Sequence, residues 1–210
     1  MANTIETMAP EALLRSIIDG SLTELVDDTM TGSLQQRKLS HETNMTRLCL
    51  PSISGVTDYA IASGTTLSKI DISNASNISQ YGISGLKTSA LVLKKNLTGS
   101  QYNTLNVAVP IIDMFSANSI SNNYFNKTTT KTLIIRKTSG VQAVIGNSVS
   151  GWTGLTLYVP SALIDDYTRA TNWSTVLANS SNQILSIEGS EYEHYYADGT
   201  PIEIEGGGTE

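Results

Sequence analysis

Short apolar-x-apolar triplets recur along the chain at a nearly constant interval. They occupy residues 48–50, 70–72, 91–93, 112–114, 133–135 and 155–157. Their first members are separated by 22, 21, 21, 21 and 22 residues. In a β-strand the two outer residues of such a triplet point to one face and the middle residue points to the other. Each triplet therefore predicts a short strand with one buried face.

Two further columns keep the same period. Six residues after the triplets lie Val56, Ile78, Gly99, Ile120, Val141 and Leu163, and nine or ten residues after them lie Tyr59, Tyr81, Tyr102, Tyr124, Ile145 and Tyr167. A degraded first copy precedes them at Val26, Asp28, Leu34 and Leu39, and the unit that begins at Leu155 is expected to be the last. One such unit cannot bury its own apolar face, so the units stack into a solenoid with a parallel sheet along it. We expect the tyrosine column to cover the core from the opposite wall.

The stretch LCLPSISGVTDYAIASGTTLSKIDISNASNISQYGISGL, residues 48–86, contains two of these units. It resembles the irregular, BspA-type leucine-rich repeat family, in which a strand, a proline or polar turn and a Tyr-Ala-Phe motif recur at a similar period. Ile61 and Ile83 stand where the family has phenylalanine, and the family's usual cysteine is absent. The resemblance covers about residues 20–190. It implies a leucine-rich-repeat solenoid with short parallel strands every 21 to 22 residues and irregular or short helical returns.

Both ends of the array are expected to carry helical caps, because the outermost apolar layers need shielding from water. Residues 10–19, PEALLRSIID, predict a short helix that caps the array or docks on a partner; Pro10 suits a first helical position. After Pro160 a second helix is expected to run to about Ala170, and Trp173 would close over the last core layer.

The residues after this second cap, EYEHYYADGTPIEIE, predict an acidic hairpin with its turn at Asp198-Gly199. We therefore divide the chain into four parts. They are an N-terminal helix or docking segment (1–20), the solenoid (21–158), a C-terminal capping unit (159–190), and the acidic hairpin with a flexible tail (191–210).

Composition narrows the choice of partner. The formal net charge is -6 and only 15% of the residues are charged, so no nucleic acid partner is expected. No apolar run reaches the roughly 18 residues needed to cross a bilayer, so no membrane insertion is expected. The first ten residues carry Glu6 and no Lys or Arg, a pattern unlike a secretory signal. The single Cys49 excludes an internal disulfide.

Catalytic motifs are missing from the sequence. It contains no phosphate-binding GxxxxGK[ST], GxGxxG, GxSxG, HExxH or CxxC motif. The Asp165-Asp166 pair does not suit acid–base catalysis, because neighbours on a helix point about 100° apart. Cys49, in the middle of a predicted strand, has only Arg47 nearby to lower its pKa, which favours an inert thiol. We therefore expect a protein that is not an enzyme and has no cofactor.

A metal site is the other chemical alternative. His41 and His194 lie far apart in the sequence. Glu191, Glu193, His194 and Asp198 could ligate a metal if the hairpin folded onto itself. A solvated acidic hairpin accounts for the same residues more simply, so no metal is expected.

The solvent side of the strand sheet is the candidate binding surface, because solenoids commonly bind partners along such a face. The charged and aromatic side chains expected there are Lys69, Asp71, Lys94, Asp113, Phe115, Arg136 and Tyr158. Together they would suit a polar glycan or a protein partner. Any solvated sheet face also needs polar residues, and that reading stays open.

The stretch TLIIRKTSG, followed by GLTLYVPSALIDDYTRATNWS, is similar to the closing unit of family members from bacteriophages and prophages of gut Firmicutes and from bacterial surface adhesins. The resemblance implies a non-enzymatic phage structural or adhesion protein at the virion surface, such as a tail fibre or baseplate component. Its partners would be other virion proteins or a host-surface protein or glycan. The alternatives are a bacterial cell-surface adhesin and an intracellular inhibitor of a host protein. A homo-oligomer is compatible with this reading, although no long heptad run specifies one.

Overall fold

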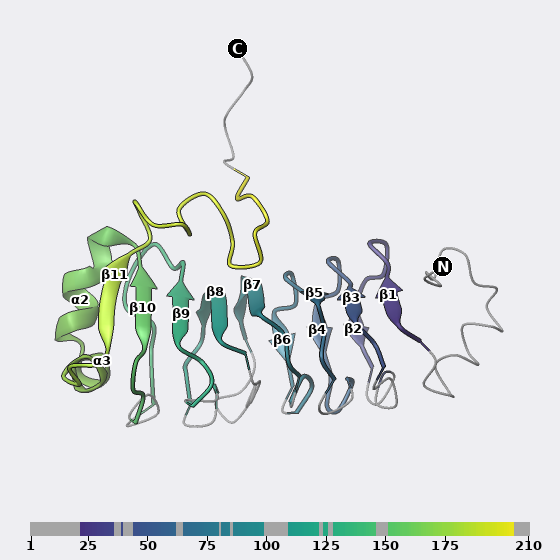
Figure 1. Ribbon diagram of the computed structural model, residues 1–210, viewed down its shortest axis with the longest axis horizontal. Helices are drawn as coiled ribbons and strands as arrows, with labels where there is room; N and C mark the ends of the chain where they lie inside the picture. Colours follow the sequence, from purple (N-terminus) through teal and green to yellow (C-terminus); the bar gives the residue numbers. More distant parts are fainter. Residues whose placement is uncertain are drawn as a thin grey trace, which may run out of the picture.

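The chain winds into an elongated β-solenoid in the computed structural model (Figure 1). The structure describes residues 22–35, 39, 44–61, 65–79, 81–84, 86–98, 109–121, 124–125, 128–145 and 151–203. The expected helix at 10–19, His41, Gly99, Tyr102 and the end of the tail lie outside these residues.

Parallel strands build the walls of the solenoid. A three-stranded sheet contains β1 (Glu24–Val26), β3 (Arg47–Cys49) and β5 (Lys69–Asp71), and a five-stranded sheet contains β7 (Ala90–Leu97), β8 (Ile111–Ala117), β9 (Thr132–Ile135), β10 (Thr156–Val159) and β11 (Gln183–Ser186). These two sheets follow each other along one wall (Figure 1). A second three-stranded sheet, of β2 (Ser33–Leu34), β4 (Gly55–Val56) and β6 (Asn77–Ile78), lies on the opposite wall. The predicted solenoid of parallel strands is therefore confirmed.

The strand register follows the predicted period in the middle of the chain and departs from it at both ends. The core-facing residues that pair in turn are Leu25, Leu48 and Ile70 in one sheet and Leu91, Ile112, Leu133, Leu157 and Ile184 in the other. Their spacings are 48 − 25 = 23, 70 − 48 = 22, 112 − 91 = 21, 133 − 112 = 21, 157 − 133 = 24 and 184 − 157 = 27. The repeat unit thus lengthens toward the C-terminus.

Three details of the predicted register are wrong. Leu133 pairs with Leu157, not with Leu155. The first copy is centred on Leu25, because Val26 pairs with Cys49. The unit at residue 155 is not the last, since β11 pairs with β10. A shift of two residues leaves the same side chains facing the core, so an apolar pattern alone cannot detect it.

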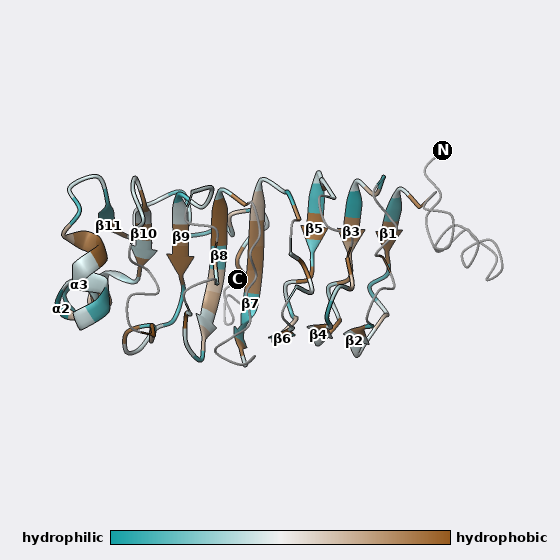
Figure 2. Ribbon diagram, turned by 90° about the horizontal axis from the view of Figure 1, so that it is seen from below, coloured by the Kyte–Doolittle hydropathy of each residue, from teal (hydrophilic) through white to brown (hydrophobic). Residues whose placement is uncertain are grey.

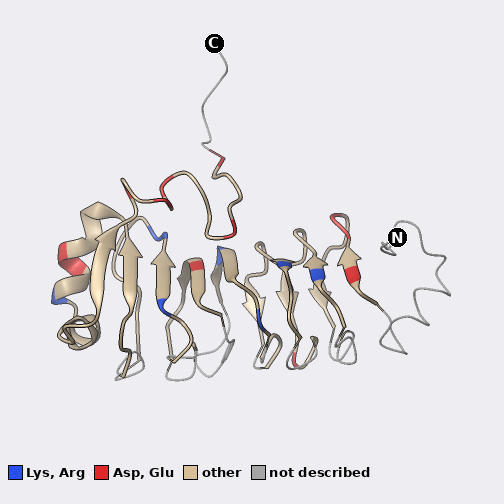
Figure 3. Cartoon of the chain, viewed as in Figure 1, with Lys and Arg blue, Asp and Glu red and all other residues tan. Residues whose placement is uncertain are grey.

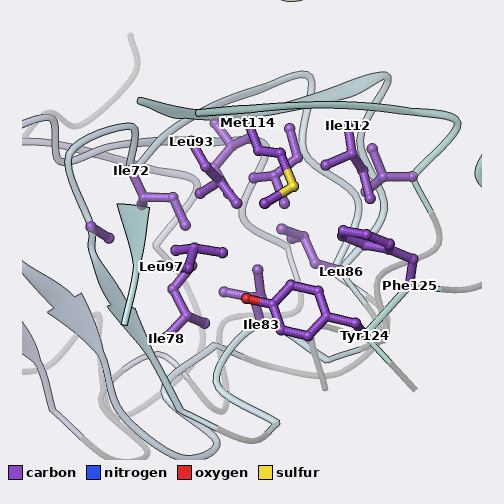
Figure 4. Close-up of a cluster of buried hydrophobic side chains, with 14 of the residues drawn as sticks. Ile72, Ile78, Ile83, Leu86, Leu93, Leu97, Ile112, Met114, Tyr124 and Phe125 are labelled. Carbon is purple, nitrogen blue, oxygen red and sulfur yellow. The ribbon is translucent and has the colours of Figure 1, made fainter. Parts of the chain in front are cut away.

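The interior is a continuous apolar core. Ile72, Leu93 and Met114 project from the strand wall toward Ile83 and Phe125 on the other side (Figure 4). The outer residues of the triplets are almost fully buried throughout. Burying one such aliphatic side chain stabilises a fold by about 1.5–3 kcal/mol, so this repeated layer carries most of the stability.

The second apolar column lines the opposite wall as expected. Leu34, Val56 and Ile78 pair as β2, β4 and β6, and Ile120 continues the row through a bridge to Val144. All but Val144 of these side chains are buried.

The tyrosine column divides between the core and the surface. Tyr124 and Tyr167 are buried, as predicted. Tyr59 and Tyr81 are 49% and 38% exposed, and Ile145 is also exposed, so the prediction is wrong for these three. Tyr59 and Tyr81 have φ angles of 53° and 63°, which turn their side chains outward at a corner of the coil.

Two short helices lie at the C-terminal end of the solenoid, α2 (Ile164–Arg169) and α3 (Thr171–Leu177), after a 3-10 turn (Ser161–Leu163). Tyr167 and Trp173 point into the core, and the Trp173 indole N–H donates to the Gln142 carbonyl at 2.9 Å. None of the helices in the described residues is long and apolar enough to cross a membrane.

Candidate functional site

The segment 187–203, here called the strap, leaves β11 and returns across the outer side of the five-stranded sheet (Figure 1). Its far end is a tight turn in which the Tyr196 amide donates to the Thr200 carbonyl at 2.8 Å and Gly199 has a φ of 81°. Tyr195 and Pro201 form an antiparallel bridge on either side of this turn. The predicted hairpin turn at Asp198-Gly199 is therefore present, but it is folded onto the sheet.

A buried ion pair anchors the strap. Arg136, just after β9, donates through Nε and Nη2 to the two carboxylate oxygens of Asp113 on β8, at 2.7 and 2.8 Å. The same guanidinium donates to the carbonyls of Tyr192 and Tyr195, both at 3.0 Å. Asp113 in turn accepts from the Ala197 amide at 2.9 Å. The pair thus links two neighbouring turns of the solenoid to three points on the strap.

Apolar contacts surround this anchor. Ile134, in the middle of β9, forms a small core cluster with Ile187 and Tyr192 of the strap. The Tyr158 ring on β10 meets the Tyr192 ring edge-on, with centroids 5.0 Å apart. In Figure 2, hydrophobic colour dominates β7, β8 and β9. The strap therefore covers an apolar strip of the sheet face, here the residues Val92, Ile111, Ile134 and Tyr158.

The electrostatics of the anchor follow from its burial. Burial raises the pKa of Asp113, while the hydrogen bonds and charge of Arg136 oppose that rise. Lys94 and Arg136 lie over the Tyr196 ring, 4.5 and 4.9 Å from its centroid, so the ring faces two cations. Burial also raises the pKa of Tyr192, to about 12.

The residues predicted for binding fall into two groups. Lys94, Asp113, Arg136 and Tyr158 contact the strap, and Asp113 is only 1% exposed. The expectation that they face solvent is wrong for Asp113, because the chain's own C-terminal segment covers it. Lys69, Asp71 and Phe115 remain accessible to different degrees; Lys69 is exposed, Phe115 is 38% exposed and Asp71 is half-buried with its carboxylate bound to Ser73.

The open part of the same wall is mixed in charge. Acidic and basic residues alternate along β1, β3 and β5 (Figure 3). Glu24, Arg47 and Lys69 occupy one register row, and the Arg47 and Glu24 side chains lie 3.8 Å apart. Cys49, the middle residue of β3, is buried.

A shallow pocket lies where the tip of the strap meets β5 and β7. Its lining residues include Ser68, Lys69, Thr88, Ser89, Ala90 and Asp198, and its volume is about 140 Å³. That volume is smaller than the roughly 300–1,000 Å³ of pockets for drug-sized ligands. The pocket therefore fits a single small polar group, and it combines side chains of the sheet with one of the strap.

The other chemical candidates are not assembled into sites. Asp165 pairs with Arg169 at 3.0 Å on the exposed face of α2. The described part of the chain holds no group of three metal-ligating residues of the His, Cys, Asp or Glu type. In the strap, Glu193 accepts from the Gly189 amide and Asp198 accepts from Thr200, so these carboxylates serve the local fold.

Sequence reasoning did not find the strap as part of the sheet face, although a signal was present. Val92 and Ile134 are apolar residues at positions where a solvated strand would carry polar side chains. The predicted hairpin contains Tyr192, Tyr195 and Tyr196. An apolar strip on one side and an aromatic segment without a core on the other indicate that the two pack together.

Comparisons with known proteins add no relative: no family model, no curated protein and no solved structure matches this chain.

Proposed function

We propose that this protein is a non-enzymatic binding protein, a phage structural or adhesion component at the virion surface such as a tail fibre or baseplate protein. It would present its solenoid to other virion proteins or to a protein or glycan of the host surface. The observation that supports this proposal most is the open, mixed-charge face of β1, β3 and β5, which ends in a polar pocket at the strap. Extended solenoid faces of this kind are widely used for binding.

The leucine-rich-repeat assignment is part of the same proposal. The spacings of 21 to 24 residues between most core positions, the short strands and the short α2 and α3 in the last turns are all compatible with an irregular leucine-rich repeat with a helical C-terminal cap. The resemblance of residues 48–86 to the BspA-type repeats supports it further.

Two other functions predict different partners. A bacterial cell-surface adhesin would be found on the envelope of the cell that makes it. An intracellular inhibitor would form a stoichiometric complex with one host protein. Nothing about the open face excludes either role, since one solenoid surface can serve unrelated partners.

The test is mass spectrometry of purified phage particles and of the particle-free lysate of the same culture. Enrichment of this chain in the particles, in proportion to known structural proteins, is the expected result. Confinement to the lysate would refute the virion proposal and favour the inhibitor, and recovery with the cell envelope would favour the adhesin.

A further inference from the structure

We propose that the pocket between the strap tip and the start of β7 binds one saccharide ring, with Lys69 and Asp198 as the two charged contacts. This inference rests on the proposed binding function and names its ligand class. It concerns a place where two parts of the chain far apart in sequence, β5 to β7 and the strap, supply one lining.

The chemistry of the lining favours a ligand with several hydroxyl groups. Asp198 offers a carboxylate, of which one oxygen already accepts from Thr200 and the other is not used in a hydrogen bond among the described residues. Lys69 offers an exposed ammonium group, and Ser89 an exposed hydroxyl. A neighbouring pair of ring hydroxyls can donate to the carboxylate and accept from the ammonium at the same time.

Charge and size exclude the other common classes of ligand. One cation and one anion in the lining cancel, so neither a phosphate nor a metal ion finds an excess of opposite charge. The volume of about 140 Å³ leaves room for one ring and not for a larger group. Ala90, which is 5% exposed, gives a small apolar patch for the C–H face of a ring. A free amino acid is the remaining neutral alternative, because its two charges could pair with Lys69 and Asp198.

The strap anchor positions the acidic side of this pocket. Asp198 directly follows Ala197, whose amide donates to Asp113 at 2.9 Å. Arg136 holds that carboxylate in place and also binds two strap carbonyls. Asp113 and Arg136 are therefore positioning residues, and release of the strap would carry Asp198 away from Lys69.

Saturation-transfer NMR of the full chain tests the inference, because a single ring in so open a site binds weakly and in fast exchange. The probes are the methyl glycosides of glucose, galactose, rhamnose and N-acetylglucosamine, with alanine as the rival zwitterion. We expect saturation of the ring protons of at least one glycoside. Asp198→Asn, which can keep the bond to Thr200, and Lys69→Gln should each weaken binding at least tenfold.

Matched controls separate a local effect from a general one. Asp166→Asn and Lys137→Gln remove exposed charges of the same kinds away from the pocket and should leave the signal unchanged. Arg136→Met should abolish the signal together with hydrogen-exchange protection of the strap, while the solenoid stays folded. Absence of transfer to every glycoside, equal transfer in Asp198→Asn and Lys69→Gln, or binding of alanine alone would each overturn the saccharide assignment. Those failures would leave the particle-association test of the proposed function unaffected.

Discussion

Replacing Arg136 with methionine is expected to release the strap without unfolding the solenoid. The guanidinium makes two bonds to Asp113 and one each to the carbonyls of Tyr192 and Tyr195. Methionine fills much of the same space but supplies no donor. The Asp113 carboxylate, which is 1% exposed, would then keep only the Ala197 amide as a partner.

The size of the effect has two bounds that agree. Removing one partner of a buried ion pair typically costs about 3–5 kcal/mol, because the remaining charge is left without compensation. The strap avoids that cost by detaching, and its docking is held mainly by Ile187 and Tyr192, whose burial contributes about 3–6 kcal/mol together. A loss of about 3 kcal/mol corresponds to a factor of roughly 150 in the docking equilibrium.

Hydrogen exchange measures this loss locally. The amides of Ala197 and Ile202 donate to Asp113 and to the His194 carbonyl, both at 2.9 Å. We expect their protection to fall about 100-fold in Arg136→Met, while amides of the core strands keep theirs. Each turn of a solenoid is stabilised chiefly by its neighbours, so a detached strap leaves the stack intact.

Two further variants give the comparison its meaning. Arg169→Met removes the exposed pair with Asp165, which is worth less than about 0.5 kcal/mol, and should leave the strap unchanged. The double variant Asp113→Leu/Arg136→Met removes both charges, and strap protection should return to within about tenfold of the original, because an apolar pair can replace a buried ion pair. Strap protection in Arg136→Met within twofold of that in Arg169→Met would refute the reasoning.

Arg136→Met should also make strap docking pH-dependent. Burial raises the pKa of Asp113 above its ordinary 3.8, and without the opposing guanidinium the rise is larger. Of the other charged groups near it, Asp198 raises that pKa further, and Lys94 shares the Tyr196 ring with Arg136. A raised pKa in the docked state means that docking is strongest below 3.8 and is lost as the pH rises through the docked-state value.

Three further predictions concern the stability of the solenoid, all measured as free energies of unfolding in urea. Burial raises the pKa of Tyr167 from 10.0 to about 12, so its contribution is present below pH 10.0 and lost as the pH rises toward 12, a change of about 3 kcal/mol. Tyr167→Phe should remove that alkaline loss, at a cost of about 1–3 kcal/mol at neutral pH because the Gln142 amide loses its acceptor; an unchanged alkaline profile would contradict this. Gly55→Ala should destabilise by about 1–3 kcal/mol, because its Cβ would lie 2.7 Å from the Asn77 carbonyl oxygen of the next turn, and a neutral effect would show that β4 and β6 can separate freely. Tyr81→Gly should change stability by less than about 1 kcal/mol, since relief of the positive φ offsets the lost ring stacking, whereas Tyr81→Val should cost about 2 kcal/mol; equal effects would argue against strain there.

The repeat period and the strand side of the core could be predicted from the sequence, because an apolar pattern records which face of a strand is buried. The register of the last turns could not. Leu155 and Leu157 are both fully buried, so a two-residue slip leaves the pattern unchanged. The longer units that end at β11 escaped a search for one fixed period.

The tyrosine column shows a finer limit. Tyr59 and Tyr81 lie nine residues after their triplets and are exposed, whereas Tyr124 and Tyr167 lie ten residues after theirs and are buried. One residue of difference at a tight corner changes the side to which a ring points. Merging the two positions into one column concealed that distinction, and Ile145 shows that the corner itself also matters.

The candidate site was predicted in part for a similar reason. Lys69 was identified from its place on the outer face of a strand, and it lines the pocket. Asp198 was identified only as a turn residue. The contact between Ala197 and Asp113 spans 84 residues, and no local pattern encodes a contact of that range.

The position of the strap at the end of the order of synthesis has a consequence for biogenesis. Each earlier turn can stack on its predecessor as it leaves the ribosome, but the apolar strip on β7 to β10 stays uncovered until residues 187–203 have been made. Translation that stops before residue 187 would yield a stack with its strands complete and a hydrophobic stripe open to other nascent chains. The last residues of the strap therefore act as a completion mark, since only a chain translated through them hides the surface by which quality control would recognise it.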